Sequence, residues 1–285
     1  MSEFLNETNK NLLEKARNHA DEYKNASPFP NISFDNFFNP EYLNKVLDEF
    51  PDLSAIKESQ KFANPKEIKL AGKGEQFFGS ETKKLMHFLN SEPFLQFLQI
   101  ITGIKEPLIS DPYFLGGGQH EIKKDGLLKV HADFNKHPKL DLDRRINVLV
   151  YLNKDWKEEY GGNFELWNQD MSMCEKKILP IFNRMAIFST TDFSYHGHPD
   201  PLNCPENRSR KSVALYYYSN GRPSYEINQG LEKHSTLFKA RQGDAKDEIA
   251  FNPKNVNKKY TAKSLIKDLT PPIVLKALKT LANKK

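Results

Sequence analysis

The sequence is poor in cysteine and has no long apolar run, and both shortages exclude classes of protein. Its 285 residues include only two cysteines, Cys174 and Cys204, which is too few for a disulfide scaffold and fits a reducing compartment. No apolar stretch reaches the roughly 18 residues that cross a membrane. The first residues lack the basic-then-apolar pattern of a secretory signal, so we expect a cytoplasmic protein.

Aromatic residues, in contrast, are plentiful. They make up 12% of the chain, and hydrophobic residues as a whole make up 38%. A mainly disordered chain is therefore excluded, because such chains are depleted in aromatics. The length predicts one or two domains with a sizeable core.

Positive charge is unevenly spread along the chain. The formal net charge is +5, but segment 253–285 holds nine lysines and one aspartate, which gives it +8 and leaves the rest at −3. The rest shows no Lys/Arg stripe interleaved with aromatics, so a nucleic-acid partner is not expected. The tail predicts a solvated helical cap or, as the alternative, a weak contact with an anionic membrane surface.

Helical patterns dominate the first 105 residues. Asn39 is a typical N-cap before Pro40, and Gly103 is a typical helix stop. Predicted helices cover 1–27, 39–50, 80–89 and 91–103, with a short strand at 32–34. Residues 52–79 show no clear period and are predicted to be a loop.

After Gly103 the pattern changes to short β-rich runs separated by turn residues. These runs are Leu127–His131, Ile146–Leu152, Asn163–Trp167, Lys177–Pro180, Met185–Phe188 and Ser212–Ser219. Many short strands of this kind predict a sandwich or barrel. The glycines at 116–118 predict a hairpin, 223–252 gives no clear prediction, and 253–285 predicts two short helices.

The motif His131-Ala132-Asp133 ends one of these runs. On a strand, residues i and i+2 point to the same face, so this imidazole and carboxylate can share a metal ion. A surface strand end with a His–Asp hydrogen bond is the plainer alternative. Further along, His196 precedes Gly197, and Arg210 opens the last run. Two histidines and one carboxylate form the facial triad of non-haem Fe(II) oxygenases.

Taken in order, these parts resemble the Fe(II)- and 2-oxoglutarate-dependent dioxygenases of the prolyl 4-hydroxylase-like group. The resemblance covers roughly 30–222. Its parts are the segment Ile32–Phe38 with Pro40–Pro51, then His131–Asp133, Arg145–Trp156, Gly161–Trp167, Pro180–Phe188, His196-Gly197 and Arg210–Ser212.

The resemblance implies an α+β fold with a mainly β core. That core is a double-stranded β-helix, which is jelly-roll or cupin-like, with supporting helices at the N-terminus. The implied divisions are helical support packed on the core in the same domain over 1–105, the catalytic core over 106–222, and a C-terminal extension with a lysine-rich helical tail over 223–285.

The resemblance also implies a set of site residues. The iron ligands would be His131, Asp133 and His196. Arg210 would hold the distal carboxylate of 2-oxoglutarate, helped by Ser212, since a guanidinium can grip a carboxylate with two hydrogen bonds. Further candidate donors to the cosubstrate are Asn147, Tyr151, His120 and Gln119.

Some neighbouring residues compete for these roles. His198 could replace His196 as a ligand, but the family's ligand directly precedes glycine, whereas His198 precedes Pro199. Arg208 competes with Arg210, which the Arg-x-Ser match favours. His137 is expected at the surface or the substrate rim. Gly161 and Gly162 are interpreted as a turn and not as part of a site.

The activity implied is hydroxylation of an unactivated C–H bond, coupled to decarboxylation of 2-oxoglutarate to succinate. Fe(II), 2-oxoglutarate and O2 are the implied cofactors and cosubstrates, with room for ascorbate. A carboxylate at Asp133 favours hydroxylation over halogenation, because related halogenases carry a small residue there. Peptidyl or free amino acids, sugars and nucleotide-sugars all stay open as substrates. The alternative to an enzyme is a cupin-like binding module without turnover.

Overall fold

The computed structural model describes residues 3–72, 74–227 and 233–252. The chain divides into two units, Met1–Gln242 and Gly243–Lys285. In the second unit, Asp244 caps helix α6 (Ala245–Phe251) by accepting a hydrogen bond from the Asp247 backbone N–H at 3.0 Å. Among the helices of the described residues, none has both the length and the apolar character to cross a bilayer.

The first unit contains five α-helices and twelve strands within its described ranges. The helices are α1 (Leu12–Lys24), α2 (Pro40–Asp48), α3 (Ser80–Leu89), α4 (Glu92–Thr102) and α5 (Ser224–Ile227), with 3-10 turns at Glu7–Asn9, Glu75–Phe77 and Glu158–Tyr160. The strands are β1 (Asn31–Asp35), β2 (Gln60–Asn64), β3 (Glu67–Ala71), β4 (Gly118–Lys123), β5 (Leu127–Ala132), β6 (Asp143–Tyr151), β7 (Phe164–Trp167), β8 (Cys174–Ile178), β9 (Arg184–Ser189), β10 (His196–His198), β11 (Ser209–Ser219) and β12 (Leu237–Phe238).

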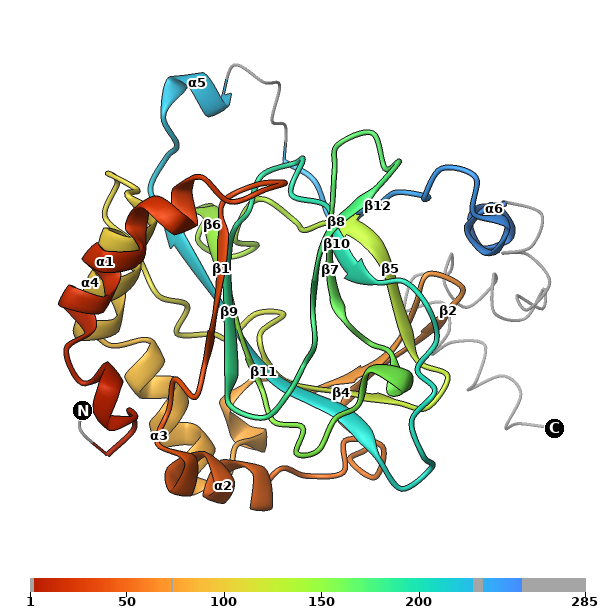
Figure 1. Ribbon diagram of the computed structural model, residues 1–285, viewed down its shortest axis with the longest axis horizontal. Coiled ribbons are helices and arrows are strands. Elements are labelled where there is room, and N and C mark those ends of the chain that lie inside the picture. Colours follow the sequence, from red (N-terminus) through yellow and green to blue (C-terminus); the bar gives the residue numbers. More distant parts are fainter. Residues whose placement is uncertain (1–2, 73, 228–232, 253–285) are drawn as a thin grey trace, which may run out of the picture. The chain divides into compact units, whose positions relative to one another are not determined.

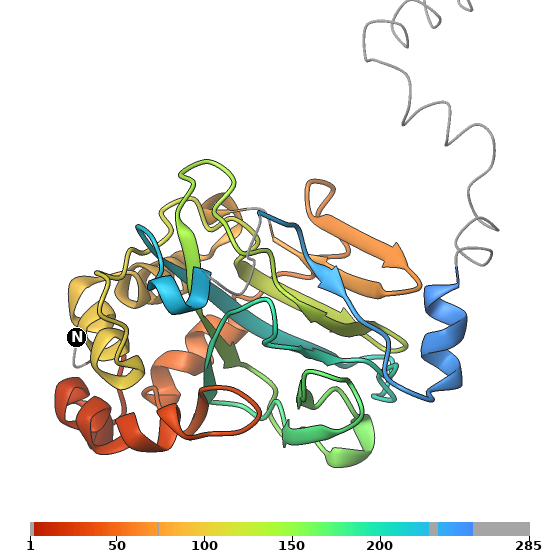
Figure 2. The ribbon, with the colours of Figure 1, turned by 90° about the horizontal axis from the view of Figure 1, so that it is seen from above.

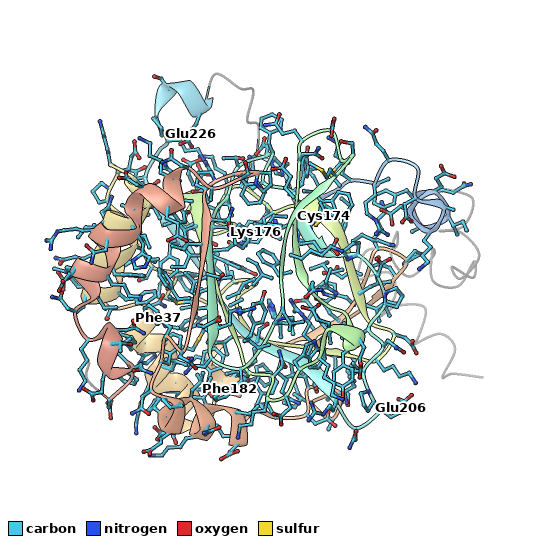
Figure 3. The ribbon with its side chains drawn as sticks, viewed as in Figure 1. Phe37, Cys174, Lys176, Phe182, Glu206 and Glu226 are labelled. Atoms are coloured by element: carbon cyan, nitrogen blue, oxygen red, sulfur yellow. The ribbon has the colours of Figure 1, made fainter. Side chains whose placement is uncertain are left out.

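Helices α1 to α4 lie along one side of the sheet (Figure 1). Their ends follow the predicted signals. The side chain of Asn39 accepts the Glu41 backbone N–H at 2.9 Å, and Gly103 ends α4 in the left-handed region at φ +67°. Phe37, labelled in Figure 3, belongs to the core between these helices and the sheet, and its ring centroid lies 5.7 Å from that of Phe97.

The twelve strands form one curled antiparallel sheet. Its order is β1-β9-β6-β11-β4-β3-β5-β10-β7-β8, with β12 pairing to β5 and β2 pairing to β3. Strand β6 shows that the two faces of the sheet have different surroundings. Val148 and Val150 belong to the core on the helix side, whereas Asn147 and Leu149 line an interior cavity. The predicted mainly β core, a double-stranded β-helix with supporting N-terminal helices, is confirmed.

The predicted loop at 52–79 is wrong. It contains the hairpin of β2 and β3, the orange pair of arrows in Figure 2, and a 3-10 turn. Strand β2 buries none of its residues, so its sequence carries no apolar alternation. The hairpin exists because β3 pairs with both β4 and β5, which is a long-range cause that local pattern cannot reveal.

Several other expectations also need correction. The glycines at 116–118 do not turn a hairpin. Gly118 instead begins β4, a strand that the pattern did not predict. The run predicted at Lys177–Pro180 is the end of β8, which starts earlier at Cys174. The short strand β10 was also missed. The two helices predicted in 253–285 lie outside the described residues, and the predicted divisions at 105 and 222 stay a prediction.

Candidate active site

The three predicted metal ligands meet at the ends of two neighbouring strands. Strands β5 and β10 lie side by side (Figure 1). His131 on β5 lies directly opposite His196 on β10, and Asp133 follows β5. One donor atom from each residue falls within 4.8 Å of the others. Asp133 Oδ1 lies 3.6 Å from His131 Nε2, and Asp133 Oδ2 lies 3.4 Å from His196 Nε2. This spacing and donor set suit a divalent transition metal with open coordination positions.

Backbone carbonyls orient both imidazole rings. His131 Nδ1 lies 2.9 Å from the carbonyl oxygen of Lys129, and His196 Nδ1 lies 2.8 Å from that of Ser194. A carbonyl only accepts, so Nδ1 carries the proton in each ring and donates it there. Both Nε2 lone pairs are thereby left for a metal, which is the usual arrangement behind ligating histidines.

One oxygen of the Asp133 carboxylate, Oδ2, accepts hydrogen bonds from two donors. Asn147 Nδ2 donates to Asp133 Oδ2 at 2.6 Å, and Arg144 Nη2 donates to the same oxygen at 3.0 Å. Arg144 also donates from Nε and Nη2 to Asn147 Oδ1, at 2.9 and 2.7 Å. These bonds fix the orientation of the carboxylate, and neither of the two donors uses Oδ1.

The charges around the triad favour the metal-binding protonation states. Burial alone would raise the pKa of Asp133, but the positive charge of Arg144, with help from His196, holds it well below the usual range. Burial, together with the neighbouring His196, lowers the pKa of His131. The site therefore presents an ionised carboxylate and a neutral imidazole near neutral pH, as metal ligation requires.

Arg144 itself was not singled out from the sequence. It is fully buried, and the central carbon of its guanidinium lies 4.3 Å from the ring centroid of Phe134 and 3.4 Å from that of Tyr216. These cation–π contacts help to fix the guanidinium in place. The sequence signal was weak, because Arg144 stands beside another arginine ahead of the predicted run at Ile146–Leu152, and only the fold brings it to Asp133.

An inner cavity of about 80 Å³ extends from the triad to Arg210. Arg210 is buried, and its Nε donates to the carbonyl oxygen of Gly162 at 2.9 Å. Its Nη2 lies 3.5 Å from Tyr151 Oη. Gly162 has φ +72°, and a Cβ there would lie 3.1 Å from Arg210 Cδ and 2.5 Å from Leu202 Cδ2. The glycine interpreted as an ordinary turn therefore supports the arginine, and that interpretation was incomplete.

Strand register brings further predicted residues to this cavity. On β11, Ser212 lies opposite Tyr151 on one side and His120 on the other. Ser212, Asn147 and His120 all line the cavity. His120 Nε2 lies 3.1 Å from the Gly116 carbonyl oxygen. Tyr151 does not line the cavity, but it contacts Arg210, which does.

The competing residues are also placed. Arg208 donates to the carbonyl oxygens of Lys154 and Asp155 and lines no part of the inner cavity, so Arg210 is the arginine at the site. Gln119 is buried on β4 and is not a lining residue of either cavity described here. His198 does line the inner cavity.

The expectation that His137 lies at the surface or the substrate rim is wrong, because it is buried and lines neither cavity. Its side chain is fully buried, and Nε2 lies 3.3 Å from Asp111 Oδ1. Its Nδ1 accepts the backbone N–H groups of Lys139 and Leu140, at 3.1 and 3.0 Å. His137 therefore holds its own loop together, a use that depends on a long-range partner.

A larger cavity of about 470 Å³, called the outer cavity here, is also lined by His131 and Asp133. The hairpin β2–β3 and the loop before β4 form its walls, with Phe62, Lys69 and Tyr113 among the lining residues. His131 and Asp133 line both cavities, so the triad lies where the two meet. Lys69 also lines both, and its Nζ lies 2.8 Å from Glu67 Oε1. Lys69 could not be predicted as a site residue, because the strand that carries it, β3, was predicted to be loop.

Comparison with known proteins decides the family of this core. Residues 118–218 match the model of the 2OG-Fe(II) oxygenase superfamily. The chain carries a 2OG-Fe(II) oxygenase domain. The matched segment runs from β4 through β11 and so includes all three triad residues, Arg210 and Ser212.

Solved structures share the fold of the oxygenase domain. A prolyl-4-hydroxylase from Pseudomonas putida is 13% identical, with a TM-score of 0.53 over 72% of this chain and 100% of that chain. A 2OG-Fe(II) oxygenase family oxidoreductase from Burkholderia pseudomallei is 12% identical, with a TM-score of 0.50 over 73% and 94%. HygX from Streptomyces hygroscopicus, with nickel and 2-oxoglutarate bound, is 11% identical, with a TM-score of 0.50 over 77% and 97%.

These findings confirm the predicted resemblance and the prediction that the protein is an enzyme, a 2-oxoglutarate-dependent oxygenase. The match of residues 118–218 to the 2OG-Fe(II) oxygenase superfamily implies Fe(II) and 2-oxoglutarate, together with O2. The alternative of a cupin-like module without turnover gains no support from them.

Proposed function

We propose that the oxygenase domain hydroxylates an unactivated C–H bond of its substrate and couples this to the decarboxylation of 2-oxoglutarate to succinate. One observation carries the proposal. The three ligand atoms of His131, Asp133 and His196 meet where an inner cavity that ends at buried Arg210 joins a larger outer cavity. A cosubstrate and a substrate could thus approach one metal from two sides.

The residues present fit an Fe(II) ion held by His131, Asp133 and His196. Once bound, the iron with 2-oxoglutarate supplies the oxidising chemistry that inserts an oxygen atom into a C–H bond. The protein orients the ligands through the hydrogen bonds from Arg144 and Asn147 to Asp133. Both donors bond to Oδ2, and neither bonds to Oδ1.

Arg210 would hold the distal carboxylate of 2-oxoglutarate. Its Nε donates to the carbonyl oxygen of Gly162, which fixes the guanidinium, while Nη2 makes only a long contact of 3.5 Å with Tyr151 Oη. The terminal nitrogens would thus retain N–H groups for the ligand. Ser212, on the same face of β11, would add a hydroxyl donor, and His120 stays a candidate donor. Tyr151 would act by supporting Arg210, since its ring lies 5.0 Å from the guanidinium carbon.

We propose a different role for Asn147 from the one expected. Its amide nitrogen donates to Asp133 and its amide oxygen accepts from Arg144. With both amide atoms engaged in this way, Asn147 positions the metal ligand and does not bind the cosubstrate.

The outer cavity is where we place the substrate. It combines aromatic side chains such as Phe62, Tyr113 and Phe134 with the charged pair Glu67 and Lys69. One structure that shares the fold of the domain is named a prolyl-4-hydroxylase, which keeps peptidyl proline among the candidate substrates. A succinate-release screen over peptides, free amino acids, sugars and nucleotide-sugars tests the candidate substrates.

The proposed function itself is tested by anaerobic titration of the protein with Fe(II) and then with 2-oxoglutarate. A weak visible charge-transfer band is expected on addition of 2-oxoglutarate, because its keto acid end would chelate the iron. The band should be lost in His131→Ala and kept in His87→Ala, whose side chain is exposed on α3. A wild-type protein without the band, or a His131→Ala variant that keeps it, contradicts the proposal.

Three expectations stay predictions. They are a cytoplasmic location, a benefit from ascorbate, and a weak contact of segment 253–285 with anionic membranes. Deleting 262–285 and measuring co-sedimentation with anionic liposomes tests the last of these. Binding that is negligible with and without the segment removes the idea.

A further inference from the structure

His198 is a buried polar side chain whose role the triad does not explain. It lies on β10 two residues after His196, and only 4% of it is exposed. Among the described residues, neither of its ring nitrogens has a hydrogen-bond partner. Buried polar groups are nearly always paired in folded proteins, so an unpaired imidazole in a cavity wall points to a ligand.

The backbone of β10 directs His198 into the inner cavity. His196 lies opposite His131, whereas His198 lies opposite Leu128, so the register shifts between them. A Cβ on Gly197 would lie 2.7 Å from the Leu128 carbonyl oxygen, so only glycine allows this close approach to β5. Residues i and i+2 share a face, and both imidazoles therefore line the inner cavity.

His198 is not a spare metal ligand. The donor atoms that come within 4.8 Å of one another belong to His131, Asp133 and His196, and in the described part of the chain no fourth residue joins this group. The side chains that line the cavity with His198 include the cations Arg210 and Lys69 and the hydroxyl of Ser212. These groups suit an anion at the end of the cavity reached by Arg210.

We infer that His198 donates a hydrogen bond to the distal carboxylate of the oxo acid, beside Arg210, and so helps the enzyme select a dicarboxylate over a monocarboxylate oxo acid. The inference rests on the proposed function. A neutral imidazole presents one N–H in either tautomer, and a carboxylate has two oxygens with lone pairs to spare. Arg210 can thus grip the carboxylate while His198 bonds to it from β10.

The test measures binding of oxo acids to the Fe(II)-loaded protein without oxygen, by the charge-transfer band. Two probes share the chelating end. 2-Oxoglutarate has the distal carboxylate and 2-oxobutyrate lacks it. In His198→Ala, the Kd for 2-oxoglutarate should rise about tenfold or more, as expected on losing a hydrogen bond to a charged group. The Kd for 2-oxobutyrate and that for Fe(II) should not change.

Two further variants complete the test. His198→Asn keeps a short donor and should recover part of the affinity for 2-oxoglutarate, and it serves if the alanine variant does not fold. His87→Ala changes a histidine whose side chain is exposed, and this variant should behave as wild type. Unchanged 2-oxoglutarate binding in both His198 variants overturns the inference, and so does equal weakening for the two oxo acids. Absence of the band in the wild-type protein instead overturns the proposed function on which the inference rests.

Discussion

Replacing Asn147 by alanine should weaken metal binding without abolishing it. Asn147 does not belong to the ligand triad, but it makes the shorter of the two hydrogen bonds to Asp133 Oδ2, at 2.6 Å against 3.0 Å from Arg144. Its loss leaves Arg144 as the sole donor of the pair and also removes the oxygen that Arg144 contacts twice. The carboxylate then becomes freer to rotate away from the two imidazoles.

The expected size follows from comparable partners of metal ligands, whose loss reduces metal affinity about 10- to 100-fold. This corresponds to about 1.4–2.7 kcal/mol of binding free energy. The variant should also lose stability by about 1–3 kcal/mol, because buried donors of Arg144 lose their acceptor. Metal affinity is measured anaerobically by competition of Fe(II) or Co(II) with a chromophoric chelator, and stability by urea unfolding of the metal-free protein.

Asn9→Ala is the matched control. Asn9 is equally buried, and its amide donates to the carbonyl oxygens of Phe37 and Asn36 at 2.9 and 3.2 Å, in the N-terminal segment. The control should lose a similar amount of stability and keep the wild-type metal affinity. The reasoning is refuted if folded Asn147→Ala binds metal as tightly as wild type and Asn9→Ala.

Three further predictions concern the same site. Gly162→Ala should raise the Kd for 2-oxoglutarate several-fold and lower the free energy of unfolding by about 1–3 kcal/mol. The reason is that Gly162 has a positive φ and that an added Cβ would press on Arg210 and Leu202. A variant with wild-type binding would show that this turn does not support the arginine. Arg210→Lys keeps the charge but loses the planar fork, so the same Kd should rise about tenfold or more by anaerobic titration, and an unchanged Kd would argue against a forked grip. The metal-free protein should lose stability on acidification from about pH 6.5, because the pKa of buried His131 is lowered and the unfolded chain binds the proton more readily, by up to about 1.4 kcal/mol per pH unit. Asp133, whose pKa is also lowered, adds stability above about pH 3.9 that is lost as the pH falls below that value. Urea unfolding at pH 7.5, 6.0 and 5.0 checks the histidine effect, and a flat profile would contradict it.

The metal ligands could be predicted because their signals are local. His131 and Asp133 stand at the spacing that puts two side chains on one face of a strand, and His196 precedes a glycine at the place where the resemblance expects it. The helix ends at Asn39 and Gly103 were predictable for the same reason, since capping depends on a few adjacent residues.

The rest of the site depends on contacts between distant parts of the chain. Arg144 gains its role only when the fold brings its guanidinium against the rings of Phe134 and Tyr216, and Lys69 only when β3 pairs with β4 and β5. Similarly, the sequence around His137 predicts an exposed side chain, but the fold buries it 3.3 Å from Asp111, which belongs to an earlier loop. A single sequence carries no local signal for such pairings.

The pairing of His131 on β5 with His196 on β10 also bears on how long the protein survives in a cell. An ion held by both residues would join two strands that are far apart in the sequence, and any ligand that binds only the folded state stabilises it by mass action. The population of opened molecules, which proteases attack, would then fall as iron becomes available. Iron supply would set not only the turnover of this enzyme but also its abundance.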